Sequence, residues 1–128
     1  MGCSGGIGAG VEGIHASVAA LDALTLEDAS LASGSGAGVD VLQRRYELCL
    51  ERMEVTTRLE AQLAAVKARD AAEAIEFQQA MTPPDASVQD STYAEMSTVE
   101  EIAGVLTVSS AAAGAFVEQS RRVCSLPR

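Results

Sequence analysis

Residues 40–81 read DVLQRRYELCLERMEVTTRLEAQLAAVKARDAAEAIEFQQAM, an uninterrupted run without glycine or proline. Residues with high helix propensity dominate this run, and the Asp40 carboxylate can accept hydrogen bonds from the free amide groups of a first helical turn. Thr82-Pro83-Pro84 follows directly, and proline ends a helix because it lacks an N–H donor and disfavours helix in the preceding residue. The sequence therefore predicts one long helix over 40–81.

Apolar side chains recur along this predicted helix in steps of three and four residues, close to the 3.5-residue repeat of a coiled coil. A helix of this length cannot bury the whole stripe against a monomer of this size. We therefore expect either a break near Lys67–Asp70 or a partner helix, which a second copy of the chain could supply. The predicted association seam consists of Leu42, Tyr46, Cys49, Met53, Leu59, Leu63 and Val66.

The residues before the long helix predict a flexible start and a shorter helix. Residues 1–10 are rich in glycine and are expected to be flexible. A helix is predicted over about 11–24, with a short helical turn at 25–28 and a Gly/Ser loop at 33–38. The apolar stripe of this helix is formed by Val11, Ile14, Val18 and Leu21.

Two further helices are predicted after a polar connection over 82–97. Thr98-Val-Glu-Glu101 has the pattern of a capping box, in which hydroxyl and carboxylate satisfy free amides at a helix start. Thr107–Ser109 is expected to form a tight turn, and Ser109 to cap a last helix that runs to about Cys124. The sequence therefore predicts a helix-turn-helix-like pair over 98–124.

A helix-turn-helix places the start of its second helix at the edges of the bases. In this chain that start lacks the Arg, Lys, Asn and Gln side chains that discriminate between bases. The net charge of −9 also disfavours binding to phosphate backbones. DNA binding is therefore expected to be weak at most, with Ser109, Ser110, Arg121 and Arg122 as the candidate contacts.

No catalytic, metal or cofactor site is expected. His15 is the only histidine and no Cys-x-x-Cys occurs, which disfavours a zinc site and a nucleophile–base pair. Gly8-Ala-Gly-Val-Glu-Gly13 has the letters of the dinucleotide fingerprint, but that motif needs a preceding strand. The sequence predicts a chain that is not an enzyme and has no small-molecule substrate.

Composition also predicts the compartment. The apolar runs are shorter than the roughly 20 residues of a membrane span, and the N-terminus lacks the pattern of a signal peptide. Three widely spaced cysteines argue against a disulfide scaffold and favour a reducing environment. We therefore expect a cytoplasmic protein with no membrane partner.

Seven segments together carry a resemblance to a known family: Ala19–Leu24, Leu42–Arg45, Leu59–Leu63, Ala65–Arg69, Glu101–Ser110, Arg121–Val123 and Leu126-Pro127. They resemble the domain of unknown function two-two-two, which precedes the nuclease part of actinobacterial HNH endonuclease-like repeat proteins. The resemblance implies a helical accessory domain that acts in assembly or in DNA positioning. No residue matches the HNH motif, so nuclease activity is not implied.

Together these features predict an all-α fold, with a flexible segment over 1–10 and a single helical domain over 11–128. The long helix is expected to pack with shorter helices. The predicted function is that of a non-catalytic accessory domain that self-associates or binds a partner helix. Two alternatives stay open: a standalone DNA-binding helix-turn-helix module, and a helical adaptor for another protein.

Overall fold

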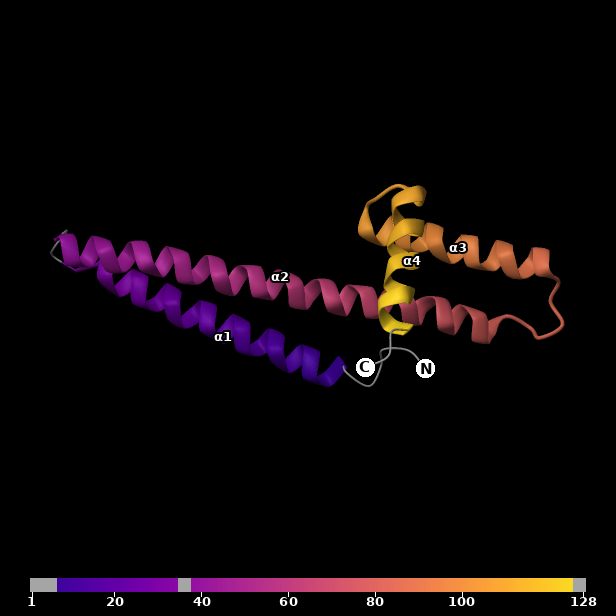
Figure 1. Ribbon diagram of the computed structural model, residues 1–128, viewed down its shortest axis with the longest axis horizontal. Coiled ribbons are helices and arrows are strands. Elements are labelled where there is room, and N and C mark those ends of the chain that lie inside the picture. Colours follow the sequence, from indigo (N-terminus) through magenta and orange to yellow (C-terminus); the bar gives the residue numbers. More distant parts are fainter. Residues whose placement is uncertain (1–6, 35–37, 126–128) are drawn as a thin grey trace. The chain divides into compact units, whose positions relative to one another are not determined.

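The computed structural model describes residues 7–34 and 38–125. These residues form no strand, which confirms the all-α fold. The long helix is also confirmed, because its observed start differs from the predicted one by a single residue. The helices are α1 (Ile7–Ala32), α2 (Val39–Met81), α3 (Val88–Leu106) and α4 (Ser110–Ser125) (Figure 1).

The chain divides into two compact units, and the boundary falls inside α2. The first unit is Gly8–Ala64, and the second, where it is described, consists of Ile7 and residues 65–125. α2 is continuous through the expected break near Lys67–Asp70. Because one helix belongs to both units, the single helical domain over 11–128 stays a prediction.

α1 is one uninterrupted helix, where the sequence predicted a helix over 11–24 and a separate turn over 25–28. It begins at Ile7, so residues 7–10 are helical; the rest of the segment over 1–10, which was predicted to be flexible, lies outside the described residues. Thr25 does not interrupt the helix, because its hydroxyl donates to the Leu21 carbonyl at 2.8 Å. Asp28 and Leu31 are half-buried, and such tertiary packing extends a helix beyond its local signals.

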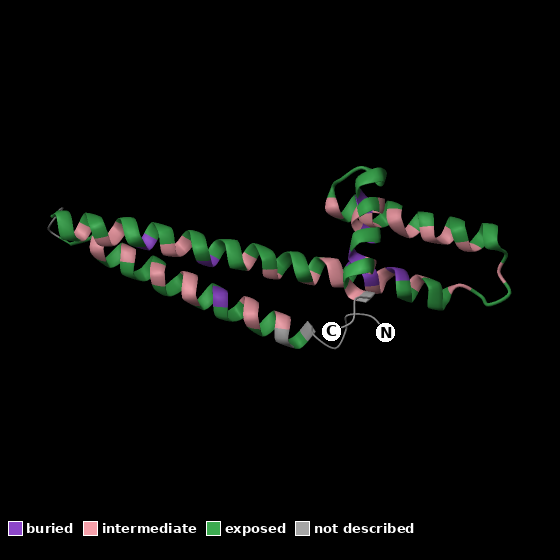
Figure 2. Cartoon of the chain, in the orientation of Figure 1, coloured by how far each residue is buried: buried purple, intermediate pink, exposed green. Residues whose placement is uncertain are grey.

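In the first unit, α1 and α2 run antiparallel (Figure 1). Two hydrogen-bonded pairs fix this arrangement, Ser17 with Gln62 and Asp28 with Arg45. The buried residues Leu48 and Val55 of α2 lie seven positions apart, the spacing that a coiled-coil seam requires. Buried and half-buried positions follow the facing sides of the two helices (Figure 2).

In the second unit, the last part of α2 packs with α3 and α4 around a small core. Ile75 is its only large side chain with no exposed surface among the described residues. Small side chains allow helices to approach closely, which suits an alanine-rich sequence. The buried apolar residues of this unit are Ala71, Ala72, Ile75, Ala103, Ala113 and Val117.

α3 begins at Val88, ten positions before the predicted capping box. Ser87 is its N-cap, and the Ser87 hydroxyl accepts from the Asp90 amide at 3.1 Å. The prediction of a cap at Thr98 was wrong, since Thr98 lies inside the helix and its hydroxyl donates to the Ala94 carbonyl at 3.1 Å. Nothing between Ser87 and Thr98 breaks a helix, so the earlier cap determines its start.

The turn between α3 and α4 lies where the sequence predicts it. Thr107 has a left-handed backbone (φ 56°), and the Val108 amide donates to the Ala103 carbonyl, as in a Schellman ending. Ser109 caps α4 as predicted, because its hydroxyl accepts from the Ala112 amide at 3.1 Å. The chain turns by 104° between the two helices.

Candidate functional site

Ion pairs join the C-terminal part of α1 to the N-terminal part of α2. The Arg44 guanidinium donates two hydrogen bonds to Glu27, at 2.6 and 2.9 Å. Arg45 donates to Asp28 at 2.9 Å, and Arg52 reaches the same carboxylate at 3.5 Å. Bidentate arginine–carboxylate pairs are directional, so they set the register of the two helices in addition to attracting them to each other. No local sequence pattern predicts this cluster.

These pairs predict a dependence of stability on pH. The hydrogen bond from Arg44 lowers the pKa of Glu27, and the hydrogen bond from Arg45 lowers the pKa of Asp28. A lowered folded-state pKa adds stability above the unfolded pKa, about 4 for both groups, and this stability is lost as the pH falls through the folded pKa. The melting temperature should therefore fall between pH 5 and about pH 3.

The control for this prediction is the double variant Glu27→Gln with Asp28→Asn. It should show a smaller fall in melting temperature over the same pH range, because it lacks the two carboxylates that titrate. Circular dichroism at 222 nm follows both proteins. Parallel losses in the two proteins would show that these ion pairs do not cause the acid sensitivity.

A neutral polar pair lies inside the α1–α2 contact. Ser17 is buried, and its hydroxyl donates to the Gln62 side-chain carbonyl at 2.7 Å. A Cβ atom at Gly13 would lie 3.0 Å from the Gln62 side-chain nitrogen, so this glycine leaves room for the amide group. The segment Gly8–Gly13 lies within α1 and not in a turn after a strand. Gly13 therefore has a packing explanation, and the geometry of a dinucleotide fingerprint is missing.

The predicted association seam lies one position away from the side of α2 that contacts α1. Leu48 and Val55 are buried, whereas Leu42, Tyr46 and Met53 have relative exposures of 53%, 60% and 57%. One residue corresponds to a rotation of about 100° around a helix. The seam therefore forms a separate apolar side of α2, here called the seam face. Of the other predicted seam residues, Cys49 and Leu63 are exposed. Leu59 and Val66 are half-buried, and they lie about three and five helical turns after Leu48, on the side of Leu48 and not on the seam face.

The candidate DNA contacts do not form one basic surface. Ser109 and Ser110 are exposed at the start of α4, and eleven positions separate Ser110 from Arg121, about 16 Å along a helix. The Arg121 guanidinium donates to Glu95 of α3 at 2.8 Å, while Arg122 is exposed. α3 contributes carboxylates and no basic residue. The electrostatic potential beside α4 is therefore unfavourable for binding a DNA phosphate.

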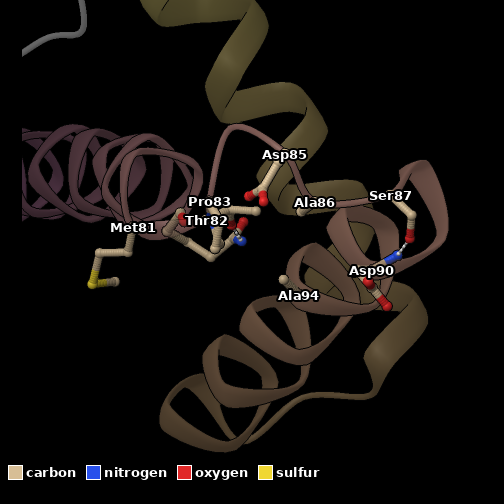
Figure 3. A pocket seen from close by; sticks show the side chains of 9 residues that line it. Met81, Thr82, Pro83, Asp85, Ala86, Ser87, Asp90 and Ala94 are labelled. Carbon is tan, nitrogen blue, oxygen red and sulfur yellow. Dashed lines mark hydrogen bonds between the residues drawn. The ribbon is translucent and has the colours of Figure 1, made fainter.

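An open depression lies where α2 ends and α3 begins (Figure 3). Its two hydroxyl groups take part in the helix ends: Ser87 caps α3, and Thr82 bonds to Gln78. Asp85 and Asp90 are exposed carboxylates, and no histidine or cysteine lines the depression. A nucleophile next to a base cannot be assembled from this lining.

Among residues 7–34 and 38–125, no three His, Cys, Asp or Glu side chains are placed to hold a metal ion. Cys124 is disulfide-bonded, which the number and spacing of the cysteines did not predict, whereas Cys49 is free.

None of the described helices is by itself both long enough and apolar enough to cross a bilayer. α3 and α4 meet these criteria only when they are taken together as a bent pair.

No protein-family model, curated protein or solved structure matches the chain. The resemblance to the domain of unknown function two-two-two therefore stays a prediction.

Proposed function

We propose that the chain is a non-catalytic helical module that self-associates through the seam face of α2. The observation that carries the proposal is the exposure of Leu42, Tyr46 and Met53 on one side of the helix. A contiguous exposed apolar patch on a small protein is a feature of protein–protein contact sites. Tyr and Met are also among the residues enriched at the centres of such contacts.

The resemblance to the HNH-associated domain supports an accessory role for this module, in assembly or in positioning DNA for a nuclease carried elsewhere. The number and spacing of the cysteines favour the cytoplasm, whereas the disulfide at Cys124 favours an oxidising compartment. Alkylation of free thiols in intact cells, followed by mass spectrometry, distinguishes the two locations.

Met53→Glu tests the proposed self-association. The variant should raise the dissociation constant of the self-associated form at least tenfold, because a charge would be desolvated at the contact. Light scattering after size exclusion, at about 10–100 µM protein, measures the change. Met53 and Ala61 are both exposed helical positions, but Ala61 lies on another side of α2, so Ala61→Glu is a matched control that should leave association unchanged. A wild-type chain that stays monomeric at 100 µM would contradict the proposal.

DNA binding through α3 and α4 is the second candidate. The observation in its favour is the 104° change of direction across a three-residue turn, which matches the helix-turn-helix range of about 90–120°. It predicts duplex binding that weakens with salt and with the double variant Arg121→Ala, Arg122→Ala. The absence of a mobility shift at 50 mM salt would reject this candidate.

A further inference from the structure

We infer that the occupant of the seam face is the hairpin of a second copy, and that α1 and α2 of both copies form a four-helix bundle. This inference rests on the self-association proposed above. It adds that α1 contributes a second apolar row to the contact. The alternative is a contact between the α2 helices alone.

The α1 row consists of residues that follow its buried positions. Ser17 is buried in the contact with α2, and Val18, one position later, is 42% exposed. Val11 lies seven positions before Val18, on the same side of the helix, and is also exposed. Ile14 and Leu21 are half-buried. Around the helix axis, they lie between the side that contacts α2 and the exposed row of Val11 and Val18. α1 therefore has an apolar row about 100° away from its contact with α2.

The seam face of α2 is likewise offset by one residue from the side of α2 that is buried against α1. Cys49 follows the buried Leu48 by one position, and Met53 lies four positions after Cys49. Both apolar rows are therefore rotated about 100° from the contact in the direction of increasing residue number. Viewed along α1 from its N-terminus, successive residues turn clockwise, whereas those of the antiparallel α2 turn anticlockwise. The buried sides of α1 and α2 face each other, so these opposite rotations place both apolar rows on the same side of the hairpin.

This shared side carries little charge. By the same rotation, Asp22 and Glu60 are its charged positions, and the opposite side of α2 carries Glu47, Glu54 and Arg58. A mainly apolar surface with only these two carboxylates does not select a partner mainly by charge. The partner surface that matches it best is equally apolar and has the same width. A second copy of the chain provides such a surface.

The available area is sufficient for a dimer. α1 has 26 residues and is therefore about 39 Å long, and two adjacent helices present a side about 20 Å wide. The shared side thus offers about 750 Å² per copy, or about 1,500 Å² in total, within the range of standard stable interfaces. A contact through α2 alone would offer about half of this area.

Charge outside the contact gives the dimer a characteristic salt dependence. Residues 8–64 contain nine acidic and four basic residues, so each hairpin has a net charge of 4 − 9 = −5. Like charges on two hairpins repel each other, and salt screens this repulsion over about 10 Å at 0.1 M. Association should therefore strengthen about threefold or more between 50 and 500 mM NaCl. Binding to DNA or to a basic partner would weaken with salt.

Val18→Glu tests the contribution of α1 by sedimentation equilibrium of the full chain. The variant should raise the dimer dissociation constant at least tenfold, because the charge would enter the apolar contact. Leu26→Glu is the matched control: Leu26 is 72% exposed, and its helical phase points it away from α2, so this variant should dimerise like the wild type. Val11→Glu is the second test variant if Val18→Glu loses helicity by circular dichroism.

The outcomes separate this inference from the proposed function. If Met53→Glu disrupts the dimer while Val18→Glu and Val11→Glu dimerise normally, the contact involves α2 alone, and the four-helix bundle is rejected while self-association stands. A monomeric wild-type chain overturns both. An assembly that weakens with salt also overturns the bundle.

Discussion

Leu48→Ala should lower the free energy of unfolding of the α1–α2 hairpin by about 2–5 kcal/mol. The Leu48 side chain has no exposed surface, so its truncation removes buried apolar area and leaves a cavity. Hydrogen exchange of the α1 amides measures the effect most directly, because α1 loses part of its contact with α2. Protection of these amides should fall by at least tenfold.

Leu42→Ala is the matched control for this variant. Both changes remove the same atoms from the same helix, but Leu42 lies on the seam face and is 53% exposed. Below the concentration at which the chain self-associates, its truncation should change stability by no more than about 0.5 kcal/mol. A cost at Leu42 that equals the cost at Leu48 would mean that the predicted seam, and not the observed side, contacts α1.

The sequence predicts the existence of α2 but not its orientation about its own axis. Two apolar rows follow this helix one position apart, and hydropathy alone favours the row that contains Leu42 and Met53. The row that contacts α1 also contains Arg45, Arg52 and Gln62, which hydropathy assigns to solvent. Their partners are Asp28 and Ser17 in α1. Pairing between residues distant in sequence makes these positions compatible with the contact, and no local pattern reports such pairing.

The start of α3 illustrates a second limit of local signals. Ser87 and Thr98 both have the sequence pattern of an N-cap, and both are followed by helix-forming residues. The capping box at Thr98 includes Glu101 and is the stronger local signal. The observed helix uses Ser87, so that Thr98 lies inside it. Local patterns thus predict that a helix exists more reliably than where it begins.

Local signals predict the turn between the helices that carry the candidate DNA contacts, but they do not predict the surroundings of Arg121. The turn and the cap at Ser109 depend on neighbouring residues, and the sequence predicts both correctly. The environment of Arg121 depends on Glu95, which lies 26 positions earlier on another helix. Because this pair partly neutralises the arginine, the charge available to a phosphate is lower than the sequence alone suggests.

Ile75→Ala should have the largest effect in the second unit, about 3–5 kcal/mol of its unfolding free energy. Ile75 has no exposed surface, and the other buried apolar residues described in this unit are four alanines and Val117. The cost of a large-to-small change depends on how far the surroundings can collapse into the cavity. Alanine side chains have no rotamers with which to fill it, so the helices themselves would have to move. The cost should therefore lie in the upper part of the usual range.

Phe77→Ala is the matched control, because it truncates a larger apolar side chain two positions along the same helix. Phe77 is exposed, so the variant should lose less than about 1 kcal/mol in spite of its larger loss of volume. Urea unfolding combined with hydrogen exchange of the α3 and α4 amides compares the two. If Phe77→Ala proved the more damaging change, the small core around Ile75 would not be what holds α3 and α4 to α2. Burial, and not the size of the side chain removed, decides the expected order, because only a buried group leaves a cavity that water does not fill.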